Sequence, residues 1–439
     1  MGEKKRLKHH LDALSSFLEL FGAPQEKIKI IHVAGTNGKG STCAMLERVL
    51  RCEGYKTGMF TSPHITRYNE RFQINGKAVT NAELARLFTL VADAQKTFFA
   101  DPDETFSFFE ILTIMSFIFF HEARVDFLLL ETGLGGRLDS TNIIKNPLVS
   151  VITSVSFDHA AILGRNISSI AFEKAGIIKK NRPAVLYLNS KDVYNVVEKK
   201  AQEQNSKLYF VGSGGVSVKI VSRSVEQTCF SAYSPLFSYE NIALSLFGDF
   251  QLDNAIGVLT VIETLCRESG VVISAAAVKK GLRAVRHPAR MEIVSKDPVC
   301  IIDGAHNEDG AKAFTGALEY FSGGRLILIV GILADKPIND IVANLPQTAA
   351  CLIATKPGAA CGYDGEDIAE AFLNIGFGGK IIIENNPQKA AETAFKTVEK
   401  NDVIAAAGSL YLCGALRGYI KRYKAFPFDI SNLTSPKRR

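Results

Sequence analysis

The chain has 439 residues, which is too long for one ordinary core and favours two or three domains. Apolar residues make up 47% and charged residues 22% of the sequence, as is typical of a soluble globular protein. The formal charge of +6 is mild for this length and does not indicate nucleic-acid binding, for which Lys and Arg would cluster with aromatic residues.

The cysteines and the apolar segments bear on the compartment. The eight cysteines form no C-x-x-C pair, and several lie in apolar runs, so we expect buried free thiols in a reducing environment. The most apolar long run, residues 111–120, is too short to span a bilayer and is typical of a core helix. The basic N-terminus lacks the apolar run of a signal peptide. We therefore expect a cytoplasmic protein with no membrane partner.

In chain order, helices and strands alternate through the first 190 residues. Apolar residues at helical spacing predict helices over 7–21, 41–55, 81–98, 107–122 and 166–179, with Asn81 as a candidate N-cap. Continuous apolar runs predict strands within 27–35, 55–65, 125–133, 147–159 and 183–189. This alternation predicts a parallel sheet covered by helices on both faces.

Three of these strands end in residues that are typical of binding sites. Gly35, Glu131 and His159 each fall at the C-terminal end of a predicted strand. Ligands of parallel sheets bind beyond the carboxyl ends of the strands. We therefore expect these three residues at one rim of the sheet.

The alternation stops after residue 205 and resumes in the last third of the chain. Four short segments, "KLYFVG", "VSVKIVS", "QTCFSAY" and "PLFSYE", predict antiparallel strands within 206–240, followed by a helix over 250–266. The prolines and charges of "RHPARMEIVSKDP" indicate a boundary near 294–298, so we predict domains over 1–295 and 296–439. The second domain alternates strands over 299–304, 325–332, 350–356, 379–385 and 403–409 with helices.

The segment "HVAGTNGKGST", residues 32–42, is here called the glycine loop. It departs from the phosphate-loop pattern G-x-x-x-x-G-K-[ST], because Val33 replaces the first glycine and Gly40 follows Lys39. Gly35, Gly38 and Gly40 still allow a tight turn whose N–H groups point at an anion, with Lys39 and a helix dipole adding positive potential. A plain glycine-rich turn with a solvated lysine is the alternative.

Two further strand ends carry polar groups. Glu131, beside a phosphate loop, is the expected partner of Mg²⁺, although a lone acid at a strand end is often only a surface residue. The polar loop "ETGLGGRLDSTN" that begins with it favours function over packing. His159, in "SFDHAAILG", is a candidate functional histidine for the same reason, against the alternative of a structural histidine.

A set of motifs in one order resembles the folylpolyglutamate synthase and dihydrofolate synthase family, within the Mur ligases. The motifs are "VAGTNGKGST", "TSPHITRYNERFQI", "LETGLGGRLDSTN", "ITSVSFDHAAILG", "IAFEKAGIIK", "FGDFQLDNA", "RHPARMEIV", "IIDGAHN" and "AGSLYLCGALR". The likeness extends over residues 28–417. It implies an α/β fold: an N-terminal P-loop NTPase-like parallel sheet domain with a small antiparallel β excursion, and a C-terminal Rossmann-like α/β domain.

The resemblance also implies the reaction, which is ATP-dependent addition of L-glutamate to a folate or to dihydropteroate through an acyl phosphate. The implied partners are these small molecules, ATP, and Mg²⁺ at two sites. A carbamate on Lys174 and a monovalent cation are further candidates. We expect a monomer.

Site residues follow from the same resemblance, motif by motif. The ATP phosphates are expected on Gly35, Thr36, Asn37, Gly38, Lys39 and Gly40, with Ser41, or Thr42 because the loop is offset, near Mg²⁺. Metal ligands are expected at Ser62, Glu131 and His159. Asn254 and Arg290 are expected to reach ATP, and Asp303 its ribose. Catalytic roles are expected for Lys39, Lys174 and His306, while Ser409, like His306, is a candidate for the glutamate side.

Two positions depart from the family's pattern. Ala289 stands where relatives often carry glycine, which puts the placement of Arg290 in question because alanine has less backbone freedom. Ala160 follows the Asp-His pair where relatives often carry a larger residue, which bears on folate binding.

Other functions compete with the folate ligase. A Mur-type ligase acting on a cell-wall nucleotide precursor would usually carry an extra N-terminal domain, and the glycine loop begins too early for one. A nucleotide switch would need the glycine loop and Glu131 but not "EKAGI", "HPAR" or "DGAHN". A catalytically inactive binding protein would be expected to have lost some of the phosphate or metal positions.

Overall fold

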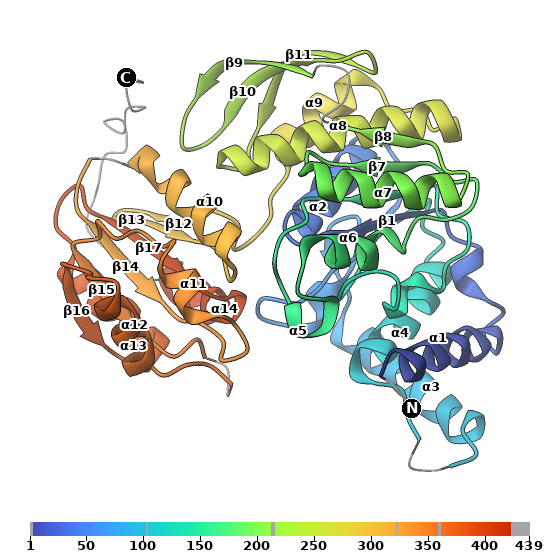
Figure 1. Cartoon of the computed structure of the whole chain (residues 1–439), viewed down its shortest axis with the longest axis horizontal. Helices are drawn as coiled ribbons and strands as arrows, with labels where there is room; N and C mark the ends of the chain where they lie inside the picture. The colour runs from blue at the N-terminus through green and yellow to red at the C-terminus, as the bar shows by residue number, and fades with distance from the viewer. Residues whose placement is uncertain (1–2, 102–103, 212–215, 322, 359–360, 423–439) are drawn as a thin grey trace. The chain divides into compact units, whose positions relative to one another are not determined.

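The computed structural model describes residues 3–101, 104–211, 216–321, 323–358 and 361–422 (Figure 1). The chain forms two compact units, and the predicted α/β fold is confirmed in both. None of the helices in the described residues combines the length and the apolar character needed to cross a membrane. All eight cysteines are free thiols, but only Cys43, Cys300, Cys351 and Cys413 are buried.

The first unit is built on an eight-stranded sheet in the order β4-β3-β2-β5-β1-β6-β7-β8. Its strands are β1 (Ile30–Ala34), β2 (Thr57–Phe60), β3 (Phe72–Ile74), β4 (Lys77–Ala78), β5 (Phe127–Glu131), β6 (Val149–Ile152), β7 (Ala184–Leu186) and β8 (Leu208–Phe210). The pairs β2–β5, β5–β1, β1–β6, β6–β7 and β7–β8 are parallel. At one edge of the sheet, β3 pairs antiparallel with both β2 and β4. Strands β1 and β5 are buried along their whole length, which explains why they appear in the sequence as continuous apolar runs.

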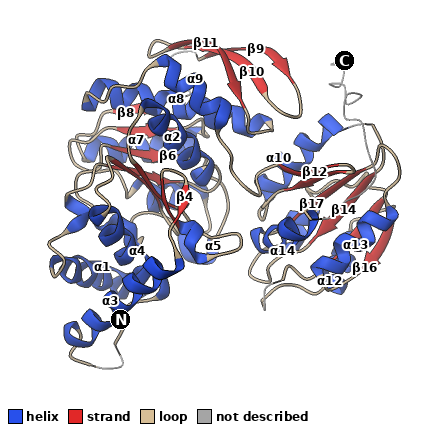
Figure 2. Ribbon diagram, turned by 180° about the vertical axis from the view of Figure 1, so that it is seen from behind, coloured by secondary structure: helices blue, strands red, loops and turns tan. Residues whose placement is uncertain are grey.

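Helices cover both faces of this sheet (Figures 1 and 2). They are α1 (Glu3–Glu19), α2 (Lys39–Glu53), α3 (Asn81–Phe98), α4 (Phe108–Glu122), α5 (Ala160–Leu163), α6 (Ile167–Ala175), α7 (Lys191–Glu203), α8 (Asp249–Ser269) and α9 (Ala275–Ala284), with short 3₁₀ turns η1 (Pro24–Glu26), η2 (Tyr68–Arg71) and η3 (Ser140–Ile143).

Side-chain alternation decides which helix packs on which face. Ile30 of β1 packs in one apolar cluster with α1, α3 and α4, and Ala34, four residues later on the same face, packs in another with α6 and α7. Tyr187, directly after β7, points to the opposite face, where it meets Thr42 of α2 and Gly257 of α8. The sheet is therefore shielded on both sides, as predicted.

Two local predictions were wrong. The segment at 207–212 was expected to be antiparallel, but β8 pairs parallel with β7 and extends the main sheet. Asn81 was expected to cap its helix, but Thr80 is the N-cap of α3, since its side chain accepts from the Glu83 N–H at 3.2 Å.

The antiparallel excursion itself is confirmed over the next segments. Strands β9 (Ser217–Arg223), β10 (Thr228–Tyr233) and β11 (Ser238–Leu244) form a three-stranded sheet in the order β11-β10-β9. Four-residue connections join them, and such short links permit only antiparallel neighbours.

The second unit contains a six-stranded sheet in the order β12-β13-β17-β14-β15-β16, in which only β12 is antiparallel. Its strands are β12 (Glu292–Lys296), β13 (Val299–Ile302), β14 (Leu326–Val330), β15 (Cys351–Ala354), β16 (Lys380–Ile383) and β17 (Val403–Ala407). Its helices are α10 (Glu308–Leu318), α11 (Ile338–Val342), α12 (Gly365–Asn374), α13 (Pro387–Thr397) and α14 (Leu410–Ile420), with the turn η4 (Glu319–Phe321).

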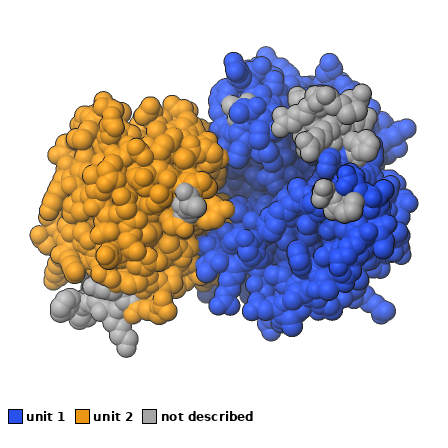
Figure 3. All heavy atoms as spheres, turned by 90° about the horizontal axis from the view of Figure 1, so that it is seen from below, with its two compact units in different colours: residues 1–220, 230–244, 253–285 blue, residues 221–229, 245–252, 286–439 orange. Residues whose placement is uncertain are grey.

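The division of the chain is less simple than one cut. The first unit comprises residues 1–220, 230–244 and 253–285, and the second comprises 221–229, 245–252 and 286–439 (Figure 3). The last change of unit falls between Val285 and Arg286. The predicted cut at 295/296 remains a prediction.

Candidate active site

The glycine loop begins within β1 and is tied to the segment that follows the neighbouring strand β6. The Thr36 N–H donates to the Ser154 carbonyl at 2.7 Å, and the Thr36 hydroxyl donates to the Ser156 carbonyl at 3.0 Å. A side chain at Gly35 would lie 1.7 Å from the Thr153 hydroxyl, so no other residue fits there without displacing Thr153. The loop is therefore held rigidly before any ligand arrives.

Within the glycine loop, Gly38 is the N-cap of α2, and its φ of 88° lies in the left-handed region that favours glycine. A side chain at Gly38 would lie 2.5 Å from the Asn254 amide oxygen, so Asn254 of α8 is directly beside Gly38. The N-terminus of α2 directs N–H groups and a positive dipole at this point, which is a site for phosphate.

Two lysines contact the loop backbone. Lys39 Nζ donates to the carbonyls of Gly35 and Thr36, both at 3.1 Å. Lys174 Nζ, from α6, donates to the same Gly35 carbonyl at 2.8 Å. Lys174 is 3% exposed, and burial, with the nearby charge of Lys39, lowers its pKa to about 7. A lysine with such a pKa is a neutral amine in much of its population at physiological pH.

The two hydroxyls after Lys39 differ in their surroundings. The Thr42 hydroxyl is fully buried and hydrogen-bonded to the Tyr187 hydroxyl at 3.0 Å. Ser41 is 3% exposed, in the first turn of α2. Both residues lie in the first turns of α2, and the Thr42 hydroxyl is engaged by Tyr187.

Glu131 lies at the end of β5, in register with Val33 of the adjacent β1. Its carboxylate is 4% exposed and accepts the Ser62 N–H at 3.2 Å, so the structure brings these two predicted ligands together. His159, the third, has a φ of 49°, and its Nε2 lies 3.7 Å from Asp158 Oδ1. In the described part of the chain, no three His, Cys, Asp or Glu residues form a group able to hold a metal by themselves.

The loop after Glu131 contains a network that sequence reasoning missed. The buried Asp139 carboxylate accepts the Leu134 N–H at 2.8 Å and the Thr141 hydroxyl at 2.5 Å, and the Thr141 oxygen meets His32 Nε2 at 2.9 Å. Burial raises the pKa of Asp139 and lowers that of His32 to about 3. A histidine inside an apolar strand was the available signal for this network.

The same loop is fastened to α6. The Arg137 guanidinium donates two hydrogen bonds to the Glu173 carboxylate, at 2.9 and 3.1 Å. The backbone N–H of Arg137 donates to the Glu173 backbone carbonyl at 2.7 Å. A side chain at Gly176 would lie 2.3 Å from Arg137 Cβ, which accounts for the glycine of "EKAGI". These contacts hold Lys174, the next residue, against the glycine loop.

The remaining predicted residues lie in the second unit, at the C-terminal ends of β13 and β17. Asp303 is 5% exposed, and its carboxylate accepts the N–H groups of Met291 at 2.7 Å and Ala305 at 2.8 Å. Burial raises its pKa. His306 Nδ1 lies 2.8 Å from the Gly304 carbonyl, so this nitrogen carries the proton.

The side chain of Ser409 makes a structural hydrogen bond. Its hydroxyl caps α14 by accepting the Leu412 N–H at 3.0 Å, and the residue is 1% exposed. Arg290 lies nearby in the chain's second unit, with Nη1 3.0 Å from where a Cβ of Gly304 would stand.

In comparison with known proteins, two parts of the chain each match a family model. Residues 33–262 match the Mur ligase middle domain, and residues 289–410 match the Mur ligase glutamate ligase domain. The chain is 32% identical to the dihydrofolate synthase/folylpolyglutamate synthase of Bacillus subtilis (strain 168), over 94% of this chain and 96% of that protein.

Solved structures agree with this. A Mycobacterium tuberculosis folylpolyglutamate synthase, complexed with ADP and AMPPCP, superposes with a TM-score of 0.85 at 30% identity, covering 94% of this chain and 96% of the other. Escherichia coli FolC, in complex with DHPP and ADP, gives 0.82 at 28% identity, covering 93% and 92%.

Proposed function

The chain belongs to the dihydrofolate synthase/folylpolyglutamate synthase family of the Mur ligases, and from this premise we propose how its residues carry the reaction. It is an ATP-dependent ligase that joins L-glutamate to a folate. The observation that supports the residue assignment best is the Gly35 carbonyl, on which Lys39 and Lys174 both converge beside the N-terminus of α2.

The carboxylate of the acceptor is a poor electrophile, so it must first be activated. A carboxylate oxygen of the acceptor attacks the γ-phosphorus of ATP, ADP leaves, and an acyl phosphate forms. The glutamate nitrogen then attacks the carbonyl carbon and inorganic phosphate leaves with the bonding electron pair, while the nitrogen loses its proton to a base. Two anions must meet in the first step, so cationic groups have to offset their repulsion.

The glycine loop is assigned to the ATP phosphates. Gly35, Gly38 and Gly40 would offer backbone N–H groups, and Lys39 would leave the carbonyls of the loop to contact the β/γ-phosphates. Asn254 would contact the nucleotide from α8. Arg290 is assigned to a nucleotide phosphate, where its planar fork suits the geometry, and Asp303 is assigned to the ribose.

Mg²⁺ is assigned to Ser62, Glu131 and His159, with Ser41 as the hydroxyl from the loop. One nearly buried carboxylate beside a phosphate loop fits this ion, which binds one or two carboxylates and completes its shell with water and phosphate oxygens. Bound there, Mg²⁺ would neutralise the charge on the phosphates. The second metal site and the monovalent cation remain predictions.

We assign to Lys174 a carbamate, formed when its side-chain amine reacts with CO₂. Carbamate formation requires a neutral amine, and burial lowers the pKa of Lys174 to about 7, which supports this reactivity. The product would be an anion 3% exposed beside Lys39. Activity that falls in CO₂-depleted buffer and returns with bicarbonate would support the modification, and activity indifferent to bicarbonate would argue against it.

His306 is assigned as the base that takes the proton from the glutamate amine. With its Nδ1 proton bonded to the Gly304 carbonyl, the neutral ring has Nε2 as its basic nitrogen, which is the atom needed to take the amine proton. Ser409 is retained as a substrate candidate, though its hydroxyl already caps α14. A monomeric, cytoplasmic enzyme is also retained as a prediction.

We propose that both dihydropteroate and reduced folates are acceptors, because the relatives from Bacillus subtilis and Escherichia coli are named for both activities. The test is phosphate release from ATP by the purified chain with each acceptor. Release should require acceptor and glutamate together, and Lys39→Ala should abolish it. Release without an acceptor would indicate a nucleotide switch, and release only with a cell-wall nucleotide precursor would indicate another Mur ligase.

A further inference from the structure

Arg290 lies in a tight arch of three residues, Ala289 to Met291. Ala289 has a φ of 55° and Met291 a φ of 45°, so two residues that are not glycine adopt the left-handed conformation on either side of the arginine. L-residues avoid this region unless surrounding contacts impose it. Something must therefore hold the arch in shape.

Two carboxylates and one carbonyl hold its backbone. Glu292 Oε2 accepts the Ala289 N–H at 3.0 Å, and Asp303 Oδ2 accepts the Met291 N–H at 2.7 Å. The Ala289 carbonyl accepts the Gly304 N–H at 2.9 Å. The two peptides that flank Arg290 are thus fixed by the Gly304 N–H on one side and by the Asp303 carboxylate on the other, and Glu292 fixes the N–H of Ala289, one peptide earlier.

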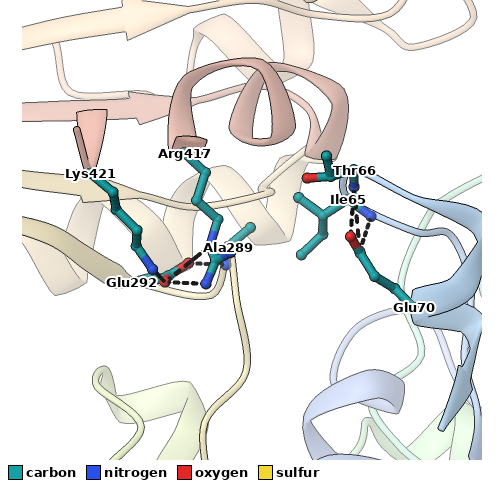
Figure 4. Close-up of polar contacts among 7 residues, drawn as sticks. All are labelled: Ile65, Thr66, Glu70, Ala289, Glu292, Arg417 and Lys421. Carbon is teal, nitrogen blue, oxygen red and sulfur yellow. Dashed lines mark hydrogen bonds and ion pairs between the residues drawn. The ribbon is translucent and has the colours of Figure 1, made fainter. Parts of the chain in front are cut away.

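Glu292 is in turn held by helix α14 (Figure 4). Arg417 donates to both its oxygens, with Nε 2.8 Å from Oε2 and Nη2 2.9 Å from Oε1, and Lys421 Nζ donates to Oε1 at 2.8 Å. The Glu292 side chain is 17% exposed. By contrast, Glu70 in the same figure accepts backbone N–H groups, those of Ile65, Thr66 and Arg67 just before it in the chain.

We propose that Glu292 is a positioning residue for the ligase reaction. Its carboxylate, held by Arg417, fixes the backbone N–H of Ala289 and thereby the arch that presents Arg290 to a nucleotide phosphate. This inference rests on the assignment of Arg290 under the proposed function. It also explains how alanine serves at position 289, because the clamp on its N–H maintains a conformation that glycine would reach without help.

A purely structural Glu292 would also be important for stability, so stability alone does not test the proposal. Binding of AMPPCP does, because it reports on Arg290 without requiring any acceptor or turnover. Failure of the ligase assignment and failure of the clamp therefore remain distinguishable. The affinities of wild type, Glu292→Gln, Arg290→Ala and the double variant form a cycle.

Asp402 offers a matched control in the same unit. Its carboxylate, 3% exposed, takes a two-pronged contact from Arg325 and the N–H groups of Arg325 and Glu399, much as Glu292 does. It precedes β17, at the end of the sheet opposite Asp303. Asp402→Asn should therefore lower the melting temperature without changing AMPPCP affinity.

The expected result is that Arg290→Ala weakens AMPPCP binding by about 30-fold, Glu292→Gln by about 10-fold, and the double variant by no more than Arg290→Ala alone. Losses that multiply in the double variant would overturn the proposal. So would wild-type affinity in Glu292→Gln, or in Arg290→Ala, or an equal loss of affinity in Asp402→Asn.

Discussion

Lys174→Met offers a sharp test of the buried amine beside the glycine loop. Lys174 is 3% exposed, and its Nζ donates to the Gly35 carbonyl at 2.8 Å. Methionine preserves most of the side-chain volume and removes the charge. We expect a protein that is more stable at neutral pH and yet inactive.

The magnitude follows from the pKa of Lys174. A fall from 10.5 to about 7 on folding corresponds to about 5 kcal/mol, at about 1.4 kcal/mol per pH unit. Methionine forfeits the hydrogen bond to Gly35, worth about 1–3 kcal/mol for a charged donor, although Lys39 still satisfies that carbonyl. The net gain for Lys174→Met below pH 7 is therefore about 2–4 kcal/mol.

The pH dependence has a definite sign. Between pH 7 and 10.5 the unfolded chain keeps the Lys174 proton while the folded protein has lost it. The unfolded state then binds more protons, so the stability of the wild type rises with pH over this window. The advantage of methionine should be largest below pH 7, shrink above it, and reverse sign by about pH 10.

The measurement is urea unfolding of both proteins from pH 6 to pH 10 in CO₂-depleted buffer, with folate-dependent phosphate release as the activity assay. Depletion matters because a carbamate would replace the amine whose titration is being followed. A methionine variant that is less stable at every pH, or whose advantage does not change with pH, would refute the reasoning.

Changes at three other positions test the site. Gly35→Ala places a methyl group 1.7 Å from the Thr153 hydroxyl, so it should lower stability by about 1–3 kcal/mol and weaken AMPPCP binding at least tenfold; unchanged binding by calorimetry would contradict this. Ala289→Val puts a β-branched residue at a φ of 55° in a buried arch and should cost at least about 2 kcal/mol in thermal unfolding, whereas Ala289→Gly should stay within about 1 kcal/mol of wild type. Glu131→Gln should reduce turnover about 100-fold or more and raise the Mg²⁺ concentration needed, while the fold survives because the amide oxygen still accepts the Ser62 N–H; an unaltered Mg²⁺ titration would remove Glu131 from the metal site.

Local pattern was sufficient for the central strands of the first sheet and for their C-terminal ends. The central strands β1, β5 and β6 lie in apolar runs, and the parallel register pairs Val33 with Glu131, which puts the two strand ends at one level, as the alternation predicts. The glycine at position 38 is where a helix begins, so its role could be inferred from the loop itself. These features depend on neighbours in the sequence and on backbone geometry.

The partners of the polar side chains were decided by the tertiary structure. Lys174 reaches a carbonyl 139 residues away, and Thr42 a hydroxyl 145 residues away. Likewise β8 joined the main sheet although its sequence resembles the hairpins that follow. Periodicity reports which face a residue occupies but not what lies opposite that face. The opposite surface is set by the packing of distant segments, and burial there changed the pKa of Lys174 and gave Thr42 its partner.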